Sequence, residues 1–128
     1  MRRVVVDASA FAAIAFGEPG GEALVARLDG ADVFAPTLLK CELINTAWKK
    51  VRRQPAEAST ILKALTVALD DRWNITWRDV VPADVALVAF ATGLTAYDAC
   101  YLWLAGSLGA DLVTLDTRLA SAGPSLPG

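Results

Sequence analysis

The chain has 128 residues, the length of one domain, and 55% of them are hydrophobic while 20% are charged. This composition excludes an intrinsically disordered chain, and a chain of this length buries enough surface to fold without disulfides or a structural metal. The sequence contains no histidine, which excludes Ser-His-Asp and Cys-His nucleophile systems and the His-based zinc motifs. Any catalysis must therefore use carboxylates, hydroxyls, lysines or arginines.

The predicted elements alternate between strands and helices along the chain. In chain order we expect a strand at 3–7, helices at 8–16 and 20–28, a strand at 32–35, a helix capped by Thr37 and running to 53, a helix at 55–69, a strand at 74–77, helices at 82–91 and 95–108, and a strand at 111–115. Continuously apolar strands separated by helices indicate a parallel sheet covered on both faces. The sequence thus predicts an α/β fold, a single three-layer α/β/α domain over residues 1–120 with a central, mainly parallel sheet of four to five strands. Residues 121–128 are expected to form a tail or a short edge strand.

Cysteine usage and one apolar segment bear on localisation. Cys41 and Cys100 are isolated residues in apolar surroundings, where we expect core positions. Nothing in the sequence requires oxidation, so we expect a cytoplasmic protein. Residues 85–110 carry one charge, Asp98, but a carboxylate in mid-span costs about 2.5–3.5 kcal/mol and a turn-forming stretch at 91–95 breaks the run. We therefore expect two buried helices joined by a turn, and no membrane partner.

Three acidic residues occupy positions where chemistry is expected. Asp7 ends the first predicted strand and Asp116 follows the last one, so both lie at the carboxyl edge of the sheet, where open α/β sheets bind ligands. The alternative for each is capping of the helix or turn that follows. Glu42 lies in the more apolar part of a helix, where an unpaired charge is costly. Its alternative is a partly exposed helix flank near Thr46.

The fourth acid, Asp98, is a solitary charge at the start of a buried helix. Its spacing from Thr95 is that of a capping box. A role in capping the helix does not exclude a role in a functional site. Four clustered carboxylates repel one another and need a compensating cation, and oxygen ligands without His or Cys favour Mg²⁺ or Mn²⁺. Such ions serve phosphoryl chemistry. The residues alone therefore predict a metal-dependent phosphodiester or phosphate hydrolase.

A basic segment at residues 40–53 favours contact with a polyanion such as an RNA backbone. It holds one acid, Glu42, against the cations Lys40, Lys49, Lys50, Arg52 and Arg53. The alternative is a solvated helix end, where cations are favourable.

Several other polar and aromatic residues allow either a functional or a structural role. Ser9 and Thr114, each two residues from an acid of the cluster, are candidates for orienting a water near the metal or for local capping. Helical or strand spacing favours core packing over base stacking for the aromatic residues Trp48, Trp73, Trp77, Tyr97 and Trp103.

The four acids lie in segments that resemble those of a PIN domain, specifically the VapC-type toxin ribonucleases of bacterial toxin–antitoxin pairs. The resemblance covers nearly the whole chain and rests on Val-Val-Val-Asp7-Ala-Ser, Leu-Leu-Lys-Cys-Glu42-Leu-Ile-Asn, Leu-Thr-Ala-Tyr-Asp98-Ala-Cys-Tyr and Asp-Leu-Val-Thr-Leu-Asp116-Thr-Arg-Leu, in this order. The C-terminal Ser-Ala-Gly-Pro-Ser-Leu-Pro-Gly departs from the family, because it leaves little of the usual last strand.

The resemblance implies a catalytic pocket in which Asp7, Glu42, Asp98 and Asp116 bind Mg²⁺ or Mn²⁺. Ser9 and Asn45 match positions that are often polar in the family and are carried over as groups that support the ligands. The resemblance also implies an endoribonuclease, a homodimer, and inhibition by a small cognate antitoxin that reaches into the pocket.

Two other functions fit the same residues. One is a metal-dependent phosphatase of similar architecture with Asp7 as a covalent nucleophile, although Asp7-Ala-Ser9 lacks a second acid two residues on. The other is a catalytically inert, PIN-like protein-binding domain whose acids serve only as helix caps.

Overall fold

The structure is a computed structural model that describes residues 1–123, apart from the side chain of Asp71. Two short 3₁₀ helices accompany the α-helices and strands. The elements in chain order are β1 (Arg3–Val6), α1 (Ala8–Ala15), α2 (Gly21–Leu28), β2 (Asp32–Pro36), α3 (Leu38–Arg53), η1 (Pro55–Glu57), α4 (Ala58–Leu69), η2 (Asp71–Trp73), β3 (Thr76–Arg78), α5 (Pro82–Thr92), α6 (Ala96–Leu108), β4 (Asp111–Val113) and α7 (Thr117–Ala122).

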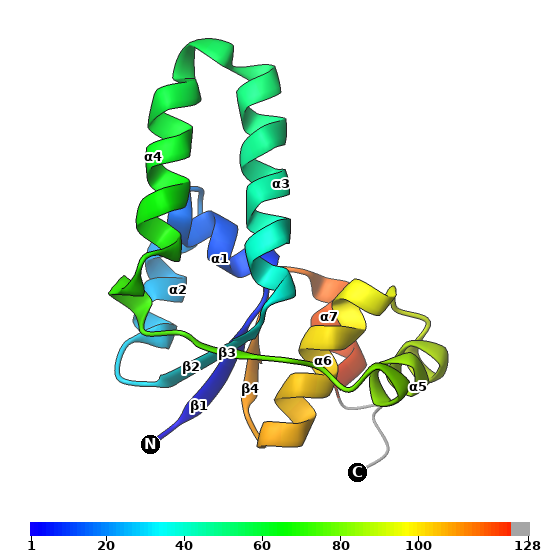
Figure 1. Cartoon of the computed structure of the whole chain (residues 1–128). Coiled ribbons are helices and arrows are strands. Elements are labelled where there is room, and N and C mark those ends of the chain that lie inside the picture. The colour runs from blue at the N-terminus through cyan, green and yellow to red at the C-terminus, as the bar shows by residue number, and fades with distance from the viewer. Residues whose placement is uncertain (124–128) are drawn as a thin grey trace.

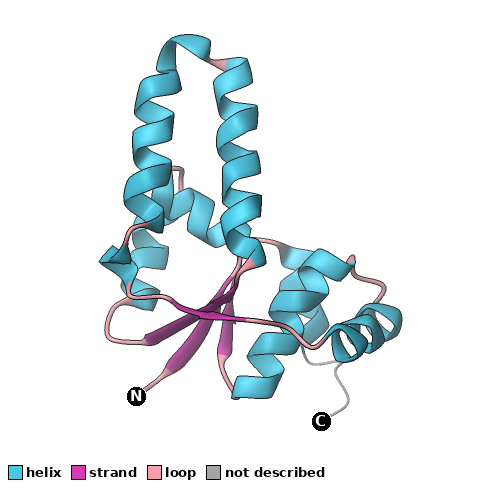
Figure 2. Cartoon of the chain, in the orientation of Figure 1, coloured by secondary structure: helices cyan, strands magenta, loops and turns pink. Residues whose placement is uncertain are grey.

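The described residues form one four-stranded sheet in the order β3-β2-β1-β4, and every neighbouring pair is parallel. The valines of β1 are fully buried because this strand lies inside the sheet, with Val5 opposite Phe34 on one side and Leu112 on the other. Figure 2 shows the strands gathered at the centre with helices around them. The predicted parallel α/β/α fold is confirmed.

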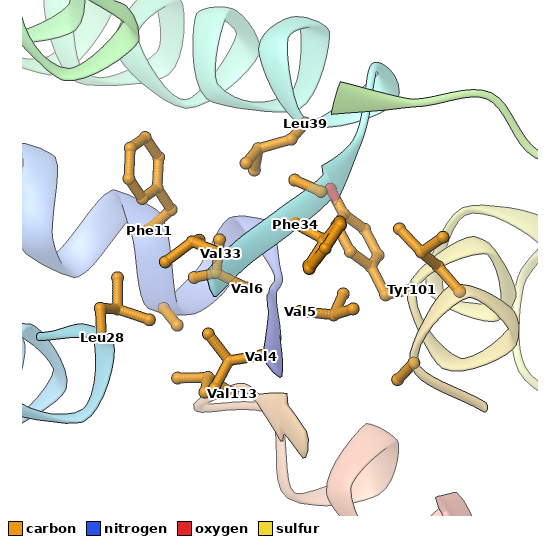
Figure 3. Close-up of a cluster of buried hydrophobic side chains, with 14 of the residues drawn as sticks. Val4, Val5, Val6, Phe11, Leu28, Val33, Phe34, Leu39, Tyr101 and Val113 are labelled. Atoms are coloured by element: carbon orange, nitrogen blue, oxygen red, sulfur yellow. The ribbon is translucent and has the colours of Figure 1, made fainter. Parts of the chain in front are cut away.

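Helices cover both faces of the sheet. α6 packs against β1, β2 and β4, and α7 packs against α6. In Figure 1, α1 and α2 lie on the opposite side of the sheet from α5 and α6, while α3 and α4 form a long hairpin that projects away from it. Between these layers the side chains of the strands, α1, α3 and α6 make one hydrophobic core (Figure 3). This arrangement directs the carboxyl ends of β1 and β4 toward the N-termini of α1 and α7.

Three local expectations differ from the structure. The side chain of Thr37 makes no capping bond, because its backbone angles are helical and not the extended ones that a capping residue adopts. Its backbone N–H donates to the carbonyl of Arg78 and so continues the β2–β3 pairing. The third strand starts at Thr76 rather than at 74, because Asn74 has a left-handed backbone with φ of 50°. Of the predicted tail or edge strand, Ser121 and Ala122 belong to α7, and residues 124–128 lie outside the described residues.

The apolar segment at 85–110 forms two helices, as predicted, but the expectation that both are buried is wrong for α5, where Leu87 and Phe90 are 64% and 81% exposed. Within residues 1–123 no single helix is long and apolar enough to cross a membrane, and α5 and α6 meet that criterion only as a pair bent by 107°. The prediction of two core cysteines is wrong for Cys41, which is exposed because it lies on the outward face of the projecting α3. Cys100 is half-buried on α6, and both thiols are free.

Candidate active site

Asp7 lies at the junction of β1 and α1 and is only 4% exposed. Its Oδ1 accepts the backbone N–H of Ala10 at 2.9 Å, which makes it the N-cap of α1, and also the hydroxyl of Ser9 at 2.8 Å. Its Oδ2 accepts the hydroxyl of Thr114 at 2.5 Å. The capping alternative is therefore correct for Asp7, but the side chain has two further partners that capping does not require.

The hydroxyls of Ser9 and Thr114 link the carboxyl ends of the neighbouring strands β1 and β4. They lie 3.3 Å apart. The Ser9 hydroxyl also accepts the backbone N–H of Leu115 at 3.0 Å, and the Thr114 hydroxyl accepts that of Asp116 at 3.0 Å. Both side chains thus contact the carboxylate of Asp7 directly. Because Thr114 accepts the backbone N–H of Asp116, it also fixes the backbone position of that acid.

Asp116 is the N-cap of α7. Its Oδ1 accepts the backbone N–H groups of Arg118 at 2.9 Å and Leu119 at 3.1 Å. Capping is thus also correct for this acid. Both bonds fall on one oxygen, so the cap does not use Oδ2.

Glu42 lies in the second turn of α3 and receives a hydrogen bond from a residue that the sequence reasoning did not single out. The hydroxyl of Tyr101 donates to Oε1 of Glu42 at 2.5 Å, and Tyr101 is 1% exposed. The hydroxyl of Thr46 bonds the backbone carbonyl of Glu42, not its carboxylate. The sequence does contain an indication of this role: Tyr101 follows Asp98 by three residues, so both side chains lie on one face of α6.

Asp98 lies in the first turn of α6 and is half-buried. Its backbone N–H donates to the hydroxyl of Thr95 at 3.3 Å, so Thr95 caps this helix as the capping-box spacing predicts. The guanidinium of Arg118 donates to the carbonyl of Gly93 at 2.8 Å. This places a cation beside Asp98, where it offsets part of the rise that burial causes in the pKa of the Asp98 carboxyl.

The four acids interact electrostatically although they come from different elements. Burial is the largest cause of a raised pKa for Asp7, Glu42 and Asp98. The charge of Asp116 raises the pKa of Asp7 and Asp98 further, while the charges of Asp98 and Asp7 raise that of Glu42. The structure therefore gathers the four predicted acids at one edge of the sheet, with Arg118 as a cation that partly compensates them.

The donor atoms of this cluster are all carboxylate or hydroxyl oxygens, the type that Mg²⁺ and Mn²⁺ prefer. Across residues 1–123, no three Asp, Glu or Cys side chains already stand in an arrangement that holds a metal ion. The chemistry of the donors thus fits a hard divalent cation.

The five predicted RNA-contacting cations have different environments on α3. Lys50 forms an ion pair with Glu18 at 2.7 Å, Lys40 lies over the ring of Trp77, and Arg52 lies over the ring of Trp48. Lys49 and Arg53 are exposed, and so is Asn45 one turn from Glu42.

The expected core packing of the aromatic residues holds for part of the set. Trp73, Trp77 and Trp103 pack against the core. The expectation is wrong for Trp48 on the projecting hairpin and for Tyr97, which are 54% and 62% exposed. Helical spacing did not separate these two cases because α3 and α6 each have an outward face that carries aromatic residues.

The family of the chain is shown by comparison with known proteins. The model of the PIN domain matches residues 4–123. The chain belongs to the PIN-domain family.

Particular relatives are similar over nearly their whole length. The chain is 34% identical to the ribonuclease VapC3 of Pyrobaculum aerophilum, over 97% of each chain. It is 30% identical to the ribonuclease VapC12 of Mycobacterium tuberculosis, over 93% of this chain and 91% of that one. The crystal structure of PAE2754 from Pyrobaculum aerophilum superposes with a TM-score of 0.76 at 27% identity, covering 98% of this chain and 90% of that one.

Proposed function

We propose that this protein is an Mg²⁺- or Mn²⁺-dependent endoribonuclease and the toxin of a toxin–antitoxin pair, acting in the cytoplasm. The observation that carries the proposal is the gathering of Asp7, Glu42, Asp98 and Asp116 at the carboxyl edge of a PIN-domain sheet. Relatives that match nearly end to end are named ribonucleases. An inert domain needs neither the mutual repulsion of these acids nor the burial of Asp7.

The proposed ligands of the cation are the four carboxylates, with Glu42 as a ligand or as the base for the attacking water. A bound divalent ion would supply Lewis acidity and lower the pKa of a water. The chain holds Asp7 in one orientation through Ser9 and Thr114. Burial first, and then the charges of Asp98 and Asp7, raise the pKa of Glu42, which brings its carboxylate closer to the range of a useful proton acceptor.

Lys49 and Arg53 are the basic residues that we propose to contact the RNA backbone. Lys49 and Arg53 follow Glu42 by seven and eleven positions, so they share its face of α3 at about 10 Å and about 16 Å along the axis. Arg52 flanks this face and stacks on Trp48. Lys50 and Lys40 are less available, because one pairs with Glu18 and the other covers Trp77.

Replacing Lys49 and Arg53 together by glutamine tests this contact. The affinity for RNA, measured in EDTA, should fall, and the slope of log Kd against log salt should decrease by roughly 1–2. Lys63→Gln on α4 is the matched control, since Lys63 is also an exposed lysine on the hairpin. An unchanged slope in the double variant would remove this segment from the RNA site.

The protein partners are a small antitoxin and a second copy of the chain. Large apolar side chains exposed on α3 and α5 are our candidates for these interfaces, since exposed apolar surface often marks an interaction site. They are Ile44, Trp48, Leu87 and Phe90. Light scattering on the purified protein should give the mass of a dimer, and Phe90→Ser should shift it to that of a monomer.

Cleavage of pooled structured RNA by the purified protein tests the proposed function. Discrete fragments should form with Mg²⁺ or Mn²⁺ and vanish with EDTA and with Asp98→Asn. Asp84→Asn is the matched control, because Asp84 lies in the first turn of α5 and is exposed. Intact RNA in every lane would favour the inert binding domain, while a phosphorylated Asp7 trapped from a phosphate ester would favour the phosphatase.

A further inference from the structure

Tyr101 combines a buried ring with a hydroxyl that reaches the candidate site. The ring lies in the core next to Val5 and Phe34, and Figure 3 shows its oxygen pointing toward the side on which α3 lies. That oxygen donates to Oε1 of Glu42 at 2.5 Å. A ring that is 1% exposed has little freedom to turn, so the hydroxyl is a fixed donor.

Glu42 depends on such a donor more than Asp7 and Asp116 do. Asp7 and Asp116 have short side chains whose oxygens are already bonded to backbone N–H groups. Glu42 has a longer side chain in the middle of a helix, where no backbone N–H is available to its carboxylate. The charges of Asp98 and Asp7 also oppose its ionised form, and repulsion by these acids drives an unrestrained side chain outward along α3.

We propose that Tyr101 is a positioning residue that holds the Glu42 carboxylate inside the acidic cluster, facing Asp7 and Asp98. This rests on the proposed function, since the orientation matters only if the cluster binds a divalent cation. Tyr101 does not touch RNA or the ion in this role. Its hydroxyl acts through one oxygen of Glu42 and leaves Oε2 for other partners.

The test is Mn²⁺ binding by the full chain without RNA, measured by isothermal titration. Tyr101→Phe removes the hydroxyl and keeps the ring, and it should weaken Mn²⁺ binding by about 10-fold to 100-fold, as the loss of groups that orient metal ligands does. Tyr97→Phe is the matched control, since it removes a hydroxyl from an exposed ring on the same helix. It should bind Mn²⁺ as the wild type does.

A double-mutant cycle separates positioning from general structural support. If Tyr101 acts through Glu42, adding Tyr101→Phe to Glu42→Gln should cause no further loss of Mn²⁺ affinity. A full additional loss, or wild-type affinity in Tyr101→Phe alone, would overturn the role of Tyr101 and leave the metal site intact. Absence of Mn²⁺ binding by the wild type would instead overturn the metal site itself, and the role of Tyr101 with it.

Discussion

The hydroxyl of Thr114 donates to Oδ2 of Asp7 at 2.5 Å, which links the carboxyl end of β4 to that of β1. The two residues are 107 positions apart in the chain. Thr114 also accepts the backbone N–H of Asp116 at 3.0 Å. The Thr114 hydroxyl therefore fixes Asp7 by contact with its side chain and Asp116 by contact with its backbone.

Thr114→Val should destabilise the protein, because it keeps the shape of the side chain and removes the hydroxyl. We expect the free energy of unfolding to fall by about 1.5–3 kcal/mol, the range for a hydrogen bond to a charged group. Urea denaturation measures this change. Thr76→Val on β3, an exposed strand threonine, is the control and should leave the midpoint nearly unchanged; equal effects of the two variants would show that the Thr114 hydroxyl has no special role.

Gly21→Ala should also destabilise the fold, at a point far from the acids. A Cβ at this position would stand 2.6 Å from the backbone oxygen of Ala13, so α1 and α2 must separate. Overpacking of this kind costs about 1–3 kcal/mol. Gly123→Ala is matched to it, since its backbone is helical and no atom of the described residues, chain neighbours aside, lies within 4 Å of the added carbon. A melting temperature that does not fall in Gly21→Ala would mean that the α1–α2 packing is looser than described.

Asp98→Asn separates the electrostatic role of Asp98 from a role in helix capping. Capping of α6 uses the Thr95 hydroxyl and the backbone of residue 98, both of which the variant keeps. Without metal, removal of one charge from the cluster should raise the melting temperature on the order of 1–3 °C, while RNA cleavage should drop by roughly 100-fold or more. Differential scanning calorimetry in EDTA tests the first outcome; a lower melting temperature would indicate that the acids do not repel one another.

The stability of the metal-free protein should depend on pH in a defined direction. The pKa values of Asp7, Glu42 and Asp98 are raised above ordinary values of 3.8 for Asp and 4.5 for Glu. Their protonated forms therefore favour folding, so this contribution is complete below about pH 4 and is lost as the pH rises through the raised values. Mn²⁺ binds the ionised forms, so the gain in melting temperature on adding Mn²⁺ should grow with pH.

Melting curves with EDTA and with Mn²⁺, taken between about pH 4.5 and 7.5, measure this dependence. In EDTA the difference between Asp98→Asn and wild type should shrink toward the acid end. A gain from Mn²⁺ that is the same at every pH would place the ion on groups other than these carboxylates.

Much of the fold follows from local patterns in the sequence. The β1 run Val4–Val6 is apolar throughout and ends in Asp7, a pattern that predicts both a buried parallel strand and a capped helix after it, and the structure has both. The spacing of Thr95 and Asp98 likewise predicts the cap at the start of α6, and the structure has it. Asn74 was mistaken for a strand residue because its left-handed backbone depends on the path of the chain from α4 to β3.

The candidate site was predictable as a set of acids but not as a set of contacts. Asp7, Glu42, Asp98 and Asp116 stand out as acids at strand ends or in apolar helices. The bonds from Thr114 to Asp7 and from Tyr101 to Glu42 join residues 107 and 59 positions apart, which no local pattern encodes. The exposure of Trp48 depends on how far the α3–α4 hairpin extends beyond the sheet, which is a tertiary property.

The end groups of the RNA fragments test the central claim most directly. A carboxylate–cation site that uses water as the nucleophile leaves a 5′-phosphate and a 3′-hydroxyl, because the RNA contributes no attacking group. Labelling and ligation of the fragments made with Mn²⁺ should therefore detect these ends. They should form with the wild-type protein and not with Asp98→Asn. A 2′,3′-cyclic phosphate with a 5′-hydroxyl would show that the ribose 2′-hydroxyl is the nucleophile, and would contradict hydrolysis at the acidic cluster.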